Sequence, residues 1–205
     1  MIRTITLEAN NKWLQLAANE IPKDTDCIII DTHVEKEDLV SPYKYREDDS
    51  TYLEHTNQVL KSASMKIKPG GTMFIYGSPR WLPYFSKFLS EETDMAFKYW
   101  IALDIANEPH QNGLVSSHVG LLLHVKGSNS PYKLNTDSVR VPYVACSYCG
   151  KNTKDWGGKK HLINKLGSCI SDVWKDYYKT TSVVEDTITP GLKLNLIDTE
   201  TSRIA

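Results

Sequence analysis

Short apolar runs alternate with amphipathic stretches along much of this 205-residue chain. The run 27–30 is continuously apolar and is followed by the carboxylate of Asp31, a pattern typical of a parallel strand that is covered on both faces. Similar runs at 72–77, 99–104 and 119–125 predict three further strands. Because ligands bind beyond the carboxyl ends of the strands in open α/β sheets, Asp31 is well placed for chemistry.

Helical periodicity fills the intervals between these runs. Apolar residues at helical spacing predict helices over 11–20, from Thr51 onward and over 81–89. The Lys-Pro-Gly-Gly segment 68–71 is expected to stop the second helix and begin the next strand. The order of elements indicates an α/β fold with a mostly parallel sheet, although the last two strands, joined by the polar loop 106–117, can run antiparallel.

The composition and the periodicity of the chain change after residue 128. Pro, Gly, Lys and aromatic residues dominate the following segment, and regular periodicity fades until Trp174. We therefore expect three parts: an α/β body at 1–128, a loop-rich extension at 129–180 that recognises DNA or binds zinc, and a polar C-terminal tail at 181–205.

Charge and apolar content narrow the classes of function. Lys and Arg number 24 and Asp and Glu number 25, so the net charge of −1 predicts no strong nonspecific attraction to nucleic acid. Any contact with DNA must come from a local basic patch or from a partner chain. The sequence contains no apolar run of the length that a signal peptide or a membrane span needs, so we expect a soluble, cytoplasmic protein.

The extension contains a candidate metal site. Cys146 and Cys149 have the spacing of one zinc knuckle, and His161 and Cys169 lie 12 and 20 residues beyond the second cysteine. In a reducing compartment such a pair favours metal over a disulfide. The alternatives are a pair of free thiols in a small turn and a site completed by two ligands from a partner chain.

A basic cluster lies in the same extension. Five lysines surround the aromatic ring of Trp156: Lys151, Lys154, Lys159, Lys160 and Lys165. Lysines beside an aromatic residue suit contact with the DNA backbone, although a solvated lysine-rich face has the same composition. Arg80 follows a predicted strand and is a further candidate for DNA contact, with a helix-end carboxylate as its alternative partner.

Seven segments, taken in order, carry a resemblance to a known family: 26–34, 60–85, 99–104, 116–127, 140–143, 154–161 and 171–174. Together they resemble the DNA N-4/N-6 methyltransferase family, in the arrangement in which the catalytic half precedes the cofactor-binding half. The resemblance extends from residue 10 to residue 178. It implies a Rossmann-like methyltransferase sheet, of which this chain holds an incomplete part, and double-stranded DNA as the substrate.

The resemblance places the catalytic motif at Asp31, Thr32, His33 and Val34. In the family, an acidic or polar residue precedes two prolines and an aromatic residue. The first side chain and a proline carbonyl accept hydrogen bonds from the exocyclic amine of a flipped base, on which the ring stacks. In this sequence Asp31 still provides a hydrogen-bond acceptor. Thr32 and His33 stand in place of the two prolines and lack their fixed φ, and Val34 stands in place of the aromatic residue and lacks a ring for stacking.

Two interpretations of this altered motif remain open. In the active one, His33 stacks on the base or donates a hydrogen bond in place of the missing ring. In the other, which we favour, the fold persists without catalysis. The aspartate at position 31 favours adenine over cytosine, because the family's cytosine-N4 members usually carry serine there.

The cofactor is the second departure from the family. Its members bind S-adenosylmethionine through a strand followed by a glycine-rich turn, where glycine lets the backbone approach the ligand. No such turn follows Trp174 in this sequence. The resemblance therefore implies that S-adenosylmethionine is shared with, or supplied by, a second chain carrying that turn, and that Asp31 borders the cofactor.

The expected function is that of a site-specific DNA amino-methyltransferase subunit of a restriction-modification type, acting on adenine N6 together with its partner chain and inactive alone. The main alternative is a catalytically inactive, methyltransferase-like subunit that binds DNA or regulates a partner. A more remote alternative is a zinc-containing DNA-binding module on an α/β scaffold.

Overall fold

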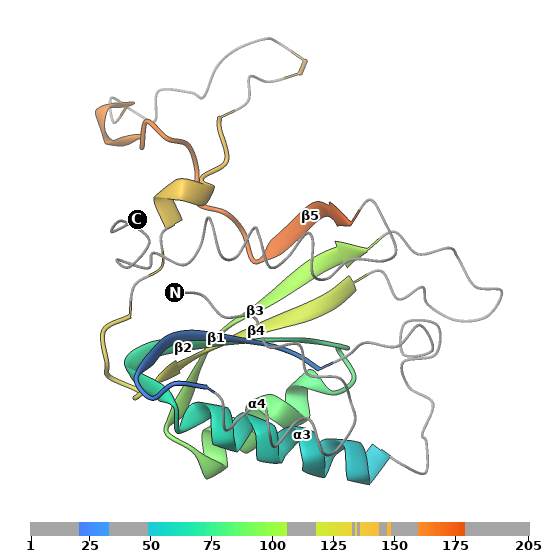
Figure 1. Cartoon of the computed structure of the whole chain (residues 1–205). Coiled ribbons are helices and arrows are strands. Elements are labelled where there is room, and N and C mark those ends of the chain that lie inside the picture. Colours follow the sequence, from blue (N-terminus) through green and yellow to red (C-terminus); the bar gives the residue numbers. More distant parts are fainter. Residues whose placement is uncertain are drawn as a thin grey trace, which may run out of the picture.

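The computed structural model describes residues 21–32, 49–105, 118–132, 134, 136–143, 147–148 and 160–178 (Figure 1). Two α-helices and two short 3-10 helices accompany a five-stranded sheet in these residues. In chain order the elements are β1 (Thr25–Asp31), α3 (Asp49–Ser64), β2 (Ile67–Gly77), α4 (Leu82–Glu92), β3 (Met95–Ile105), β4 (His118–Lys126), η1 (Thr136–Val139), η2 (Lys160–Leu162) and β5 (Val173–Tyr178).

The sheet is mixed, so the prediction of a mostly parallel sheet is wrong. Its strand order is β1-β2-β4-β3-β5, with β1 and β2 parallel, β3 and β5 parallel, and β4 antiparallel to both of its neighbours. Antiparallel pairing of β3 with β4 is confirmed. The physical reason is the short connection 106–117, because a parallel return normally requires a crossover helix.

Within the described residues, the structure confirms the four expected strands and the helices expected from Thr51 onward and over 81–89, with one difference at the Lys-Pro-Gly-Gly segment. Strand β2 begins at Ile67 and runs through that segment, because two steps along β1, from Thr25 to Cys27, face five steps along β2, from Ile67 to Thr72. Gly70 has a φ of 77°. The segment is thus an irregularity inside the strand, and a backbone conformation that suits glycine accommodates it.

Helices α3 and α4 cover one face of the sheet. The apolar side of α3 buries Leu60, and that of α4 buries Leu82, Phe85 and Leu89, all at 0% exposure. These side chains pack in one cluster with inward-facing strand residues such as Ile75. Figure 1 shows both helices on the same side of the sheet. The helical spacing of apolar residues in the sequence therefore predicts which side of each helix packs on the sheet.

The extension covers the opposite face. Leu134 and Ile170 pack against a second cluster that contains Phe74, Leu121 and the largely buried Trp174. Figure 1 shows the extension and the two helices on opposite sides of the sheet. Both faces of the sheet are thus covered, which explains why β2 and β4 read as nearly continuous apolar runs.

The sequence does not predict strand β5, because its segment falls within the loop-rich extension. It lies parallel to β3 and extends the sheet. Three interactions fix its start: the amide of Ala102 donates to the Asp172 carbonyl at 2.8 Å, Trp174 Nε1 donates to the Ser171 carbonyl at 2.8 Å, and Ser171 Oγ donates to the Val173 carbonyl at 2.7 Å. The segment 171–174 therefore ties the extension to the sheet.

Some sequence predictions lie outside the described residues: the helix at 11–20, the loop 106–117 and the tail 181–205. The division into three parts stays a prediction. Within the described ranges, no helix combines the length and the apolar content that crossing a membrane requires.

Candidate functional site at the end of β1

Asp31 and Thr32 lie where β1 ends, beside the carboxyl end of the parallel strand β2. Asp31 is the last residue of β1 and is paired in register with Tyr76. Thr32, the next residue, is 6% exposed. This is the edge of an α/β sheet at which ligands bind, as expected from the sequence. His33 and Val34, the other two residues of the predicted catalytic motif, lie outside the described residues.

Three hydrogen bonds hold Thr32 in place. Its amide donates to the Tyr76 carbonyl at 3.0 Å, and its Oγ1 donates to the same oxygen at 2.9 Å. Its own carbonyl accepts a bond from the hydroxyl of Tyr52 at 2.8 Å. A Cβ added to Gly77 would lie 2.4 Å from Thr32 Oγ1, so glycine at position 77 leaves room for the threonine hydroxyl.

An ion pair joins the start of α3 to the segment before α4. Arg80 pairs with Asp49, and the two side chains are only 12% and 7% exposed. The guanidinium also lies over the ring of Trp81, 4.1 Å from its centroid. The alternative expected for Arg80, a helix-end carboxylate, is therefore what the structure contains. Contact of Arg80 with DNA stays a prediction.

Tyr52 lies between this ion pair and the end of β1. It is three residues after Asp49 on α3, so the two side chains share one helical face. Its ring packs against Trp81 and Phe85, with centroid separations of 5.4 and 6.1 Å. Sequence reasoning did not select Tyr52. The available signal was its position in the first turn of an amphipathic helix, which does not reveal a partner 20 residues away.

The described residues do not supply a glycine-rich cradle for S-adenosylmethionine. A Cβ added at any of the six described glycines would lie 2.2–2.6 Å from another atom of the chain. Each of these glycines thus makes room for a neighbouring part of the protein.

The predicted metal ligands are only partly described. Cys146 and Cys149 lie outside the described residues, and His161 and Cys169 are both exposed. Within the described part of the chain, no group of three or more His, Cys, Asp or Glu side chains is arranged to hold a metal ion. The structure therefore neither assembles the four predicted ligands nor separates them.

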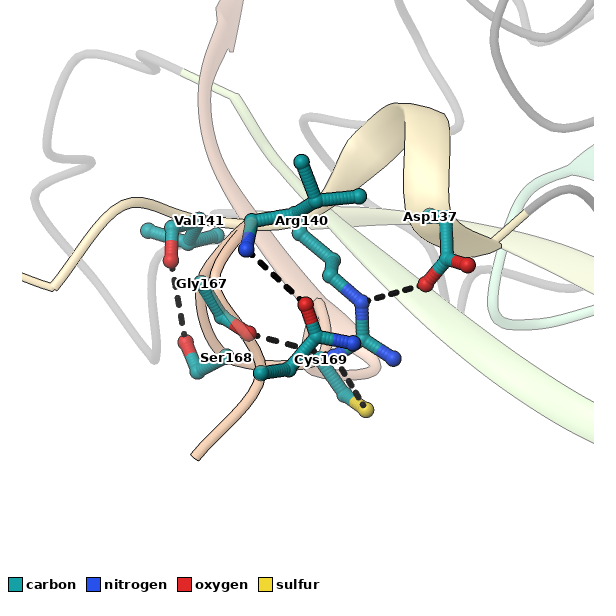
Figure 2. Close-up of polar contacts among 8 residues, drawn as sticks. Asp137, Arg140, Val141, Gly167, Ser168 and Cys169 are labelled. Atoms are coloured by element: carbon teal, nitrogen blue, oxygen red, sulfur yellow. Dashed lines mark hydrogen bonds and ion pairs between the residues drawn. The ribbon is translucent and has the colours of Figure 1, made fainter. Parts of the chain in front are cut away.

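Arg140 organises the described part of the extension around Cys169 (Figure 2). Its Nε donates to Asp137 at 2.5 Å, and one terminal nitrogen lies 3.1 Å from the Gly167 carbonyl and 3.5 Å from Cys169 Sγ. Val141 forms an antiparallel bridge with Ser168, with N–H to carbonyl distances of 3.0 and 2.9 Å. The bridge draws the chain before Cys146 next to the chain that leads to Cys169.

The residues of the extension that are predicted to contact DNA lie mostly outside the described part of the chain. This holds for Lys154, Trp156 and Lys159. Lys160 begins η2, but its side chain is not described. Lys165 is exposed beyond η2. Its exposure agrees with a surface role for the cluster and does not distinguish DNA contact from a solvated face.

Comparison with known proteins gives a sequence relative. The type II methyltransferase M.BamHI of Bacillus amyloliquefaciens is 37% identical to this chain over 130 residues. By sequence, the chain is a homologue of a DNA methyltransferase. The match covers 63% of the chain but only 30% of M.BamHI, so the chain spans less than a third of that relative's length. No protein-family model matches the chain.

Two solved structures show a partial likeness to the chain. M1.HpyAVI is 21% identical, with 66% of this chain and 59% of that chain covered and a TM-score of 0.42. A protein named as a DNA modification methylase from Thermus thermophilus, complexed with S-adenosyl-L-methionine, is 12% identical, with coverages of 80% and 66% and a TM-score of 0.48. Because both TM-scores are below 0.5, the relationship rests on the sequence match to M.BamHI.

Proposed function

We propose that this chain is a subunit of a site-specific DNA amino-methyltransferase that methylates adenine N6 together with a second chain. The observation that carries the proposal is the homology to M.BamHI, combined with the position of Asp31 at the carboxyl end of β1. In that role, the Asp31 carboxylate accepts a hydrogen bond from the exocyclic amine of a flipped base. The gain is orientation of the amine toward the methyl donor.

We place the second chain beside β1. β1 is the first strand in the sheet order, and β2 is its one neighbour among the described strands. A strand with an apolar central run, at the edge of a sheet, offers backbone groups to which another strand can pair. In this proposal, the second chain carries the glycine-rich turn that the sequence lacks after Trp174, and it supplies the methyl donor.

Methyl transfer by the reconstituted pair tests the proposal. The full chain is combined with the product of a neighbouring reading frame that encodes a glycine-rich turn, and transfer of labelled methyl groups to duplex DNA is measured. We expect methylated adenine from the pair and none from this chain alone. Asp31→Ala should lower kcat by about 100-fold, as the loss of a group that positions the reacting amine does. Glu54→Ala, at an exposed position on α3, is the control.

A non-catalytic role is the second candidate. It is favoured by the replacement of the two prolines and the aromatic residue by Thr32, His33 and Val34. In that role the chain binds DNA or regulates its partner. Unchanged activity of the pair carrying Asp31→Ala would support it and would overturn the catalytic proposal.

We also propose that the extension binds zinc through Cys146 and Cys149, with Cys169 and His161 as further ligands. The Cys-x-x-Cys spacing and the bridge between Val141 and Ser168 support this arrangement. Metal analysis of the purified chain should find about one zinc per chain. Cys146→Ser should lose the metal, whereas Cys27→Ser should keep it, because Cys27 packs against the sheet cluster.

A further inference from the structure

At the end of β1, hydrogen bonds from Thr32 and from Tyr52 stand where the family motif has a proline. We infer that Tyr52, together with the hydroxyl of Thr32, replaces the rigid proline ring and holds the Thr32 carbonyl where it accepts the target amine. The inference rests on the proposed function and adds a positioning residue to it. Thr32 stands at the position of the first proline in the resembling motif.

Proline would fix φ at this position through its ring. Thr32 is held instead by hydrogen bonds, because its amide and its Oγ1 both donate to the Tyr76 carbonyl, at 3.0 and 2.9 Å. Two donors from one residue on one acceptor restrict both the backbone and χ1. The glycine at position 77 leaves room for this arrangement, because a Cβ there would lie 2.4 Å from the threonine hydroxyl.

Tyr52 orients the other end of the residue. Its hydroxyl donates to the Thr32 carbonyl at 2.8 Å, which fixes the direction of the carbonyl at the end of the strand. A carbonyl oxygen has two lone pairs, so this bond leaves one acceptor position for an exocyclic amine. In the proposed function, the Asp31 carboxylate supplies the other acceptor for that amine.

The position of Tyr52 is itself set by packing. Its ring contacts Trp81 and Phe85, and the helix that carries it is held to the segment before α4 by the ion pair of Asp49 with Arg80. Phe85 is fully buried, so the tyrosine rests on the core and not on a loop. A hydroxyl mounted on a helix is a more rigid support than one mounted on a loop.

Two measurements test the inference with Tyr52→Phe, which removes only the hydroxyl. Tyr84→Phe is the matched control, because Tyr84 is 56% exposed on α4 and also packs against Trp81. The first measurement is hydrogen exchange of the Thr32 amide by NMR in the full chain. We expect exchange about tenfold faster in Tyr52→Phe, as the loss of one net hydrogen bond predicts, and no change in the control.

The second measurement is methyl transfer by the reconstituted pair. Tyr52→Phe should lower kcat by about tenfold while the KM for S-adenosylmethionine and the melting temperature stay close to those of the unmodified pair. A purely structural role would lower the melting temperature and leave kcat unchanged. That result, or unchanged exchange at Thr32, would overturn the inference. A pair that methylates no DNA even without substitutions would overturn the proposed function, and the exchange measurement would still decide whether Tyr52 restrains Thr32.

Discussion

His124 is a fully buried polar side chain in the middle of β4, on the face of the sheet that α4 covers. Its Nε2 lies 3.2 Å from Ser86 Oγ, and its ring packs edge-on against Phe97. Nδ1 has no hydrogen-bond partner within the described part of the chain. Burial lowers the pKa of His124 from 6.5 to about 4, since an imidazolium would lose its hydration there. The folded protein therefore holds this histidine neutral at physiological pH.

This lowered pKa makes stability depend on pH. Between pH 6.5 and about 4 the unfolded chain binds a proton at His124 that the folded chain does not, so the free energy of unfolding falls as pH falls through this window. The contribution is complete above pH 6.5 and amounts to about 3 kcal/mol.

Urea unfolding between pH 4 and 7 measures this contribution. His124→Leu should flatten the profile in that window relative to the unmodified chain. The same pH profile for His124→Leu and the unmodified chain would show that His124 does not contribute.

Two residues of the candidate site differ in how far the sequence predicts their roles. Asp31 could be predicted, because a carboxylate after a buried strand is a local pattern. The sequence does not decide the partner of Arg80, since both DNA and a helix-end carboxylate are consistent with its position. Asp49 is 31 residues away, and only the packing of α3 against the start of α4 brings the two charges together.

At the scale of elements, the first turn of α3 is clamped to the segment before α4. The Asp49–Arg80 ion pair is largely buried, and its guanidinium also stacks on Trp81. Removing one partner of a buried ion pair lowers stability far more than removing an exposed one.

Arg80→Met should therefore lower the free energy of unfolding by about 3 kcal/mol, because it leaves a largely buried carboxylate without this cation. Lys87→Met is the matched control, since Lys87 is 71% exposed in its pair with Glu91 and should change stability by less than about 0.5 kcal/mol. Denaturant titration compares the two variants. Equal losses of unfolding free energy in the two variants would mean that the buried ion pair stabilises the contact between α3 and the segment before α4 no more than an exposed pair does.

The elements that sequence reasoning missed share one cause. β5 is short and follows a loop-rich segment, so no periodicity marks it, and its place is fixed by Trp174 and by the bond from Ala102 to Asp172. The Lys-Pro-Gly-Gly segment signals a turn, but pairing with β1 keeps it inside β2. In both cases, contacts with a neighbouring strand outweighed the local signal.

At the scale of the whole molecule, both faces of the sheet are covered while the side of β1 away from β2 has no neighbour among the described strands. The chain also spans less than a third of M.BamHI. The function proposed above places a second chain beside β1.

Calorimetry tests this at the level of the cofactor. The isolated chain should bind S-adenosylmethionine at least 100-fold more weakly than the reconstituted pair, because the proposed function places the glycine-rich turn on the second chain. The pair without DNA serves as the reference. Tight binding by the isolated chain would contradict the need for a partner.

The sequence by itself determined the local elements of the body and the placement of Asp31 at a strand end, because apolar runs and helical spacing are properties of neighbouring residues. Tertiary structure decided the strand order, the direction of β4, the cover that the extension gives the sheet, and the partners of Thr32. The bond from Thr32 Oγ1 to Tyr76 joins residues 44 positions apart, and that from Tyr52 joins residues 20 apart. Such contacts depend on how complete elements pack against each other, and no local pattern encodes that.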